Sequence, residues 1–115
     1  MNEIQEKISY LPPTQQVALW VILRMPNAEE EDFRFFSYEF AESFKKFASD
    51  KITRNSKDYG KFIGGVLSGL YRNGILKRLS GGRSKLWTLS DEVKKDFGEY
   101  KKYLYEIKTY WGGSW

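Results

Sequence analysis

Hydrophobic residues recur along this chain in patterns that predict helices, a short strand and a hairpin. The first strong pattern begins at Pro12-Pro13-Thr14, where prolines are tolerated at a helix start and Thr14 is expected to cap it. This helix should run to about Arg24 and stop before Pro26. Every residue of Val17–Leu23 is apolar, so the helix must be buried on more than one side, by another helix of the chain or by a dimer partner.

A short strand and a second helix come next. Phe33–Phe36 reads as the strand, and Ser37 is expected to cap the helix, with Glu39 in its first turn. Apolar residues at three- and four-residue steps mark the buried stripe of this helix: Phe40, Ala41, Phe44, Phe47 and Ala48.

A third helix is predicted from Asn55 or Ser56 to a left-handed C-cap at Asn73-Gly74. At about 100° per residue, one side of this helix is apolar: Tyr59, Phe62, Ile63, Val66, Leu67 and Leu70. The opposite side is basic and small: Lys57, Lys61, Gly64, Gly65, Ser68 and Arg72. Each glycine costs the helix up to about 1 kcal/mol relative to alanine. The glycines are explained if a ligand approaches this side of the helix closely. Tight packing against another helix, or a break in the third helix at the glycines, would explain them as well.

Two extended segments and a last helix complete the pattern. Ile75–Leu79 and Lys85–Leu89 are joined by a Gly-Gly turn, which predicts a β-hairpin. Ser90 should cap the last helix, with Asp91 and Glu92 favouring the positive end of its dipole.

The last helix carries a heptad seam. Its apolar positions alternate by four and three residues: Val93, Phe97, Tyr100, Leu104, Ile107 and Trp111. We expect this seam to form a homodimer interface, which would present two reading helices to neighbouring half-sites. Docking onto the apolar first helix of the same chain is the alternative. The tail 112–115 is expected to be flexible, and the sequence assigns Trp115 no role.

Composition excludes several kinds of chemistry. The chain has 115 residues, enough for one core, and no cysteine or histidine. Disulfides, thiol catalysis, Cys/His zinc sites and the usual general base are therefore absent. Gly60 and Gly65 have phosphate-loop spacing, but Val66-Leu67 replace the required Lys and Ser/Thr. No apolar run approaches the roughly 20 residues of a membrane span, and no secretory signal is visible. We expect no cofactor or metal, no enzymatic activity and a cytoplasmic, nucleoid-associated location.

Charge is concentrated in the middle of the chain. The net charge of +4 conceals a block, 51–89, with nine Lys or Arg against Asp58 alone. Residues 1–50 are net acidic, with the run Glu29-Glu30-Glu31-Asp32, and 90–115 are neutral. Such a basic block is typical of a phosphate-binding surface, although a merely solvated basic surface is the alternative.

The order helix, strand, helix, helix, hairpin, helix resembles the winged helix-turn-helix family. The closest stretch is 59–78, in which Leu70, Gly74, Ile75 and Leu76 match the family's transition from third helix to wing. Trp87-Thr88-Leu89-Ser90 looks like its return into a final helix. The resemblance implies a mainly α fold (α+β) with a small antiparallel hairpin wing and an extra C-terminal helix. Small archaeal and archaeal-virus regulators of this family look most similar.

The resemblance also implies that different parts of the chain have different functions. Residues 1–89 would form the DNA-binding domain, with the reading helix at about 56–73 in the major groove and the wing at about 75–89 on the flanking backbone. Residues 90–111 would dimerise. The expected DNA-binding residues are Arg54, Ser56, Lys57, Lys61, Gly64, Gly65, Ser68, Arg72, Arg78, Arg83 and Lys85.

The predicted function is binding of double-stranded DNA, sequence-specific or architectural, in transcription regulation. A winged-helix protein–protein module within a nucleic-acid-processing or transcription complex is the main rival, and it predicts a larger exposed apolar patch. RNA binding is less favoured because the aromatic residues look like core rather than a stacking platform.

Overall fold

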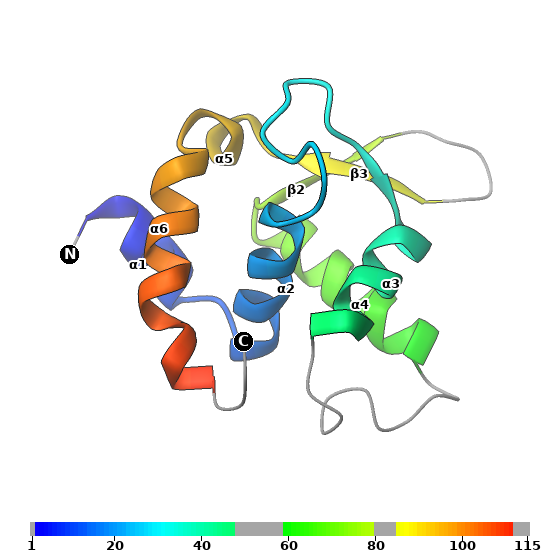
Figure 1. The fold of residues 1–115 in the computed structure, drawn as a ribbon, viewed down its shortest axis with the longest axis horizontal. Helices are drawn as coiled ribbons and strands as arrows, with labels where there is room; N and C mark the ends of the chain where they lie inside the picture. The colour runs from blue at the N-terminus through cyan, green and yellow to red at the C-terminus, as the bar shows by residue number, and fades with distance from the viewer. Residues whose placement is uncertain (1, 48–58, 80–84, 112–115) are drawn as a thin grey trace.

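The computed structural model describes residues 2–47, 59–79 and 85–111. Over these residues the chain is mostly helical with one small antiparallel sheet, so the α+β class is confirmed. The elements are α1 (Glu3–Ser9), α2 (Pro13–Leu23), β1 (Phe35–Phe36), α3 (Ser37–Phe47), α4 (Tyr59–Arg72), β2 (Leu76–Leu79), β3 (Leu86–Leu89), α5 (Asp91–Lys95), α6 (Phe97–Ile107) and the 3₁₀ turn η2 (Lys108–Trp111). Helix α2 lies in the middle, with α1 and α6 on one side and α3 and α4 on the other (Figure 1).

The sheet joins the predicted hairpin to the short strand. Its order is β1-β3-β2, and both neighbouring pairs are antiparallel. Trp87 of β3 lies opposite Phe35 of β1 and Arg78 of β2. The strand predicted over Phe33–Phe36 is shortened to its last two residues, and the Phe33 carbonyl instead accepts a hydrogen bond from the Thr88 hydroxyl.

The hydrophobic core is built around α2. Every side chain of Val17–Leu23 is buried, as their unbroken apolar run predicts. Helix α2 packs against α3, α4 and α6, so neighbours within the chain cover it on several sides. Helices of the same chain therefore bury α2, and a dimer partner is not needed to cover it.

The predicted dimer seam is used inside this core, and the interface prediction is wrong at three of its six positions. Val93, Tyr100 and Leu104 have no exposed surface in the single chain. The remaining seam residues are partly buried against the same core: Phe97, Ile107 and Trp111. Because one cluster unites the seam with α2, residues 90–111 do not form a separate unit.

The last helix is also not continuous. It divides at Asp96 (φ −111°, ψ 33°) into α5 and α6. A heptad seam needs an unbroken helix to keep its apolar positions on one line. The division lets the two pieces pack at different angles on the core (Figure 1).

Helix ends follow the sequence at two of four predicted caps. Gly74 has φ +75° and forms a Schellman motif, in which its N–H binds the Tyr71 carbonyl and the Ile75 N–H binds the Leu70 carbonyl. The Ser90 hydroxyl accepts from the Val93 N–H, as expected of an N-cap.

The other two cap predictions are wrong. Helix α2 begins at Pro13 after Pro12, with no side-chain cap, so Thr14 lies inside the helix. Ser37 is the first residue of α3, and its hydroxyl accepts from the Trp87 indole N–H at 2.9 Å. The Glu39 carboxylate accepts the Phe36 N–H at the start of α3. Thr14 and Ser37 both lie inside their helices, C-terminal to the N-cap position, so their hydroxyls do not cap.

Helix α1 is an element that the hydrophobic pattern does not predict. A capping box begins it, with Asn2 accepting from the Gln5 N–H and Gln5 accepting from the Asn2 N–H. Ile8 is buried, and α1 packs against α6. In the described part of the chain, no helix is both long and apolar enough to cross a membrane.

Candidate nucleic-acid interface

Helix α4 has the two faces that its sequence predicts. Ile63, Val66, Leu67 and Leu70 are buried, and Tyr59 and Phe62 pack partly buried against the core. On the other side Lys61, Gly65 and Arg72 are exposed, while Gly64 and Ser68 are half-buried. The predicted split between an apolar inner side and a basic, small outer side is confirmed over Tyr59–Arg72.

The glycines of α4 have two different surroundings. A Cβ at Gly69 would meet the amide end of the Gln15 side chain on α2, a flexible group that would have to move aside. A Cβ at Gly60, Gly64 or Gly65 would have no neighbour within 4 Å. Among the glycines of α4, a Cβ would therefore meet a described neighbour only at Gly69. The other three weaken the helix, by up to about 1 kcal/mol each, without improving the described interior.

Helix α4 is fixed at both ends. The Tyr59 hydroxyl donates to the Ala41 carbonyl of α3 at 2.6 Å, and burial raises the pKa of Tyr59. At the other end, the Tyr71 ring stands edge-on to Trp87 of β3, with centroids 6.2 Å apart. These contacts hold α4 against both α3 and the hairpin.

The hairpin brings two more cations to the side on which α4 packs. Arg78 lies directly opposite Trp87, so its side chain leaves the same face of the sheet that Tyr71 contacts. Lys85 lies two residues before Trp87, a spacing that keeps side chains of an extended strand on one face. Both residues are exposed.

We call the exposed cations on α4 and the hairpin the cationic surface: Lys61, Arg72, Arg78 and Lys85. None of these four forms an ion pair with another described residue. Helix α4 itself contains no carboxylate. Within the described part of the chain, the cationic surface is therefore not neutralised by carboxylates.

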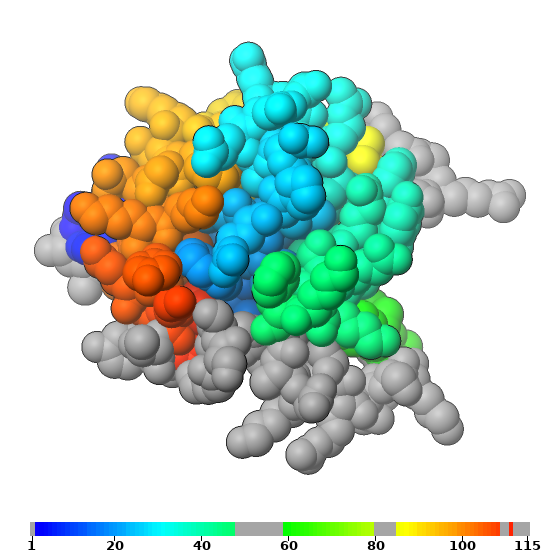
Figure 2. Space-filling view, in the orientation of Figure 1, coloured from blue at the N-terminus to red at the C-terminus, as the bar shows by residue number. Residues whose placement is uncertain are grey.

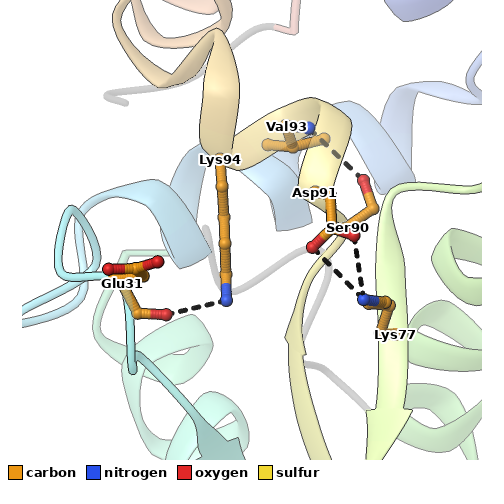
Figure 3. A network of polar contacts seen from close by, with 6 residues as sticks. All are labelled: Glu31, Lys77, Ser90, Asp91, Val93 and Lys94. Atoms are coloured by element: carbon orange, nitrogen blue, oxygen red, sulfur yellow. Dashed lines mark hydrogen bonds and ion pairs between the residues drawn. The ribbon is translucent and has the colours of Figure 1, made fainter.

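Lys77, the neighbour of Arg78, is different. Its ammonium lies 3.2 Å from the Asp91 carboxylate at the start of α5 (Figure 3). On the same helix, Lys94 donates to the Glu31 carbonyl at 2.9 Å. Helix α5 therefore lies between the hairpin and the acidic loop 29–32 and contacts both. The sequence indicated only a helix-dipole role for Asp91, and no local pattern predicted its pairing with Lys77.

Several predicted DNA-binding residues lie outside the described residues: Arg54, Ser56, Lys57 and Arg83. The predicted start of the third helix, the Gly-Gly turn and the tail 112–115 also lie outside them. All the other residues of the predicted set belong to α4, β2 or the residue before β3. The remaining seven therefore lie on α4 and on the β2–β3 hairpin, which pack against each other.

The acidic loop is set apart from α4. Glu29, Glu30, Glu31 and Asp32 are all exposed. Their segment projects at the top of the molecule, whereas the visible part of α4 lies at the lower right (Figure 2). The loop borders a surface hollow of about 550 Å³ that is lined by both acidic and basic side chains, among them Asp91 and Lys94. In the described ranges, no three carboxylates are grouped to hold a metal ion.

One buried polar group lies far from α4. The Tyr100 hydroxyl has no hydrogen-bond partner among the described residues. Burial raises the pKa of Tyr100 to about 12, with further contributions from the carboxylates of Glu92, Asp96 and Glu3. Because this side chain has no exposed surface, it belongs to the core rather than to a surface site.

Comparison with known proteins found no match. The chain matches no family model, no curated protein and no solved structure. Any functional assignment therefore depends on the geometry of the cationic surface and its surroundings.

Proposed function

We propose that this chain is a winged helix-turn-helix protein that binds double-stranded DNA, with α4 in the major groove and the β2–β3 hairpin on the flanking backbone. Helices α3 and α4 would form the helix-turn-helix, and β1-β3-β2 the sheet from which the wing extends. The role would be regulation of transcription at chosen sequences or architectural coating of DNA. No catalytic step belongs to this proposal.

One observation carries it: four cations that form no ion pair with a described residue lie on α4 and on the hairpin face against which α4 packs. Proteins that bind DNA neutralise phosphates with Lys and Arg, and they need a protruding element that fits a groove about 12 Å wide. The outer side of α4 is slim, because Gly64 and Gly65 add no side chain to it. Charge and shape thus favour the same ligand.

The rival proposal, a protein-binding module, has one observation in its favour. On the outer face of the sheet, Phe36, Leu86 and Leu79 form a cross-strand row and are all half-buried. Tyr38 stacks on Phe36 with ring centroids 5.5 Å apart and is 61% exposed. This row is apolar, but it belongs to the opposite face of the sheet from Arg78, so the two surfaces can be tested separately.

Fluorescence anisotropy with a labelled duplex over a salt series tests the DNA proposal. We expect affinity to fall steeply with salt, with a log–log slope of about −0.9 for each phosphate contacted. Single-stranded DNA and RNA should compete poorly. Lys61→Ala and Arg72→Ala should each weaken binding and each reduce the slope by about 1.

Lys102→Ala is the matched control, because Lys102 is an exposed lysine on α6, on the far side of α2 from α4. It should change neither affinity nor slope beyond error. A flat salt dependence, or equal losses in Lys61→Ala and Lys102→Ala, would contradict DNA binding by the cationic surface. If Tyr38→Ala then abolished association with a protein partner while Lys61→Ala did not, the adaptor proposal would replace it.

A further inference from the structure

One exposed aromatic side chain lies next to the cationic surface. Tyr71, the residue before Arg72 at the end of α4, is 47% exposed. Among the described residues, its ring contacts Trp87 and its hydroxyl has no hydrogen-bond partner. Packing of α4 on the hairpin therefore accounts for the ring of Tyr71 and not for its hydroxyl.

The position of the Tyr71 ring is fixed by a buried tryptophan. The Trp87 side chain is buried, and its indole N–H donates to the Ser37 hydroxyl at 2.9 Å, which orients the indole. The Tyr71 ring stands edge-on to this indole, with an angle of 88° between the ring planes. Edge-to-face pairs of this kind are a favoured arrangement of aromatic rings. Because tyrosine has only two side-chain torsions, a ring held in this way loses little conformational entropy when its hydroxyl binds a ligand.

Two arginines of the cationic surface neighbour this tyrosine. Arg78 lies directly opposite Trp87 on the same face of the sheet, where cross-strand Cβ atoms are about 4.5–5.5 Å apart. Arg72 follows Tyr71 directly in the sequence. Neither arginine forms an ion pair with a described residue. At this junction of α4 and the hairpin, an anion can therefore be bound by positive charge and by a neutral hydroxyl together.

We infer that the Tyr71 hydroxyl donates a hydrogen bond to a phosphate of duplex DNA at the junction of α4 and the hairpin. The inference rests on the proposed function and adds to it a residue that the sequence pattern did not indicate. Tyrosine is among the side chains that bind DNA phosphates, and such contacts fix the position of a protein on the duplex. Because the hydroxyl is neutral, its contact does not contribute to the salt dependence of binding, unlike the contacts of Lys and Arg.

Tyr71→Phe tests this contact in the full chain, because it removes the hydroxyl and keeps the ring against Trp87. Duplex affinity, measured by anisotropy, should fall about three- to tenfold, the effect of one net hydrogen bond. The factor should be the same across the salt series, whereas Arg72→Ala should reduce the log–log slope by about 1. Two duplexes of unrelated sequence should show the same factor, since both present the same phosphates. The free energy of unfolding in urea should be unchanged.

Tyr105→Phe is the matched control. Tyr105 is 60% exposed, and its ring packs against another tryptophan, Trp20, with centroids 6.1 Å apart. It belongs to α6, on the far side of α2 from α4 (Figure 1). Its replacement should leave duplex affinity unchanged at every salt concentration.

Each alternative outcome has its own meaning. Parental affinity in Tyr71→Phe, or equal losses in Tyr71→Phe and Tyr105→Phe, would overturn the inference and leave the proposed function intact if Arg72→Ala still weakens binding. A lower salt slope or a lower free energy of unfolding in Tyr71→Phe would also overturn it, because the tyrosine would then act by positioning its neighbours. Different losses on the two duplexes would overturn it in favour of a contact with a base edge. Absence of duplex binding by the parent protein would overturn the proposed function itself.

Discussion

Helices α4 and α6 are both amphipathic and both carry exposed lysine, yet they relate differently to the rest of the molecule. The apolar side of α6 places Tyr100 and Leu104 fully inside the core, and its outer side mixes Glu99 and Glu106 with Lys102. The outer side of α4 has cations and glycines and no carboxylate. An amphipathic pattern therefore identifies the buried side of a helix, while the chemistry of the other side indicates its use.

Glycine placement sharpens this contrast. Gly98 of α6 and Gly65 of α4 are both exposed, and a Cβ at either would have no neighbour within 4 Å. The two differ in their surroundings: Gly98 is followed directly by Glu99, whereas the described helix α4 around Gly65 contains no carboxylate. We expect α6 to serve stability and α4 to serve binding, and the following variants separate those roles.

The largest expected effect comes from the core side of α6. Leu104→Ala should lower the free energy of unfolding by about 2–5 kcal/mol, because Leu104 is fully buried and its loss leaves a cavity. Urea titration followed by tryptophan fluorescence measures it. The unfolding midpoint should not depend on protein concentration. A midpoint that rises with concentration in the parent protein would mean that the C-terminal helix pairs between chains after all.

Gly65→Ala should act on stability and binding in opposite directions. It should raise the free energy of unfolding by up to about 1 kcal/mol, since alanine favours the helix and the added methyl meets nothing. Duplex affinity should fall, because the methyl lies where the helix approaches DNA. Gly98→Ala is the control: it should gain stability with unchanged affinity. Unchanged affinity in Gly65→Ala would show that this side of α4 does not approach DNA.

A smaller effect is expected where Asp91 neutralises Lys77. This ion pair is exposed, with side chains 52% and 84% accessible for Lys77 and Asp91, so it contributes at most about 1 kcal/mol. Lys77 leaves the sheet on the face opposite Arg78, so Asp91→Asn should act by removing a negative charge beside the hairpin. It should raise duplex affinity by no more than about fivefold, measured by anisotropy at low salt.

Glu106→Gln is matched to it in charge. Glu106 is an exposed carboxylate on α6, on the other side of α2 from α4. Its affinity gain should be clearly smaller. Equal gains in the two variants would indicate that net charge alone, rather than position, governs binding.

The smallest effect at neutral pH is expected for Tyr100→Phe. The lost hydroxyl has no partner among the described residues, so stability should be unchanged or slightly higher. The folded-state pKa of Tyr100 is raised from 10.0 to about 12, so its protonated form favours folding. That contribution is fully present below pH 10 and is lost as pH rises through 12. Tyr100→Phe should therefore keep its stability better in alkaline unfolding. A loss of stability at pH 7 would reveal a hydrogen bond to the hydroxyl.

Local signals in the sequence predicted much of this fold. The spacing of apolar residues in α4, the alternation around the hairpin and the glycine after α4 each depend on neighbours within a few residues. Helix α1 was also within reach, because Asn2 and Gln5 have capping-box spacing. It was not predicted because its apolar pattern is weak, with Ile8 as its buried residue.

Long-range choices could not be predicted from the same signals. The apolar residues of a heptad seam can be buried against a second chain or against α2. The spacing is the same in both cases, and only the three-dimensional packing shows that α2 covers them. The pairing of Lys77 with Asp91 joins residues on different elements, so no spacing rule indicates it. For the interface, sequence identified the cations, and the structure showed that Arg78 and Lys85 share the sheet face that α4 packs against.

The most direct test of the account is an amide ¹H–¹⁵N NMR titration of the full chain with a short duplex. The central claim is that the outer side of α4 and the cations of the hairpin contact DNA together. The account predicts the largest shift changes at Gly64, Gly65, Ser68, Arg72, Arg78 and Lys85, with little change along α6. Changes centred on α6, α1 or the acidic loop, with α4 unaffected, would contradict it.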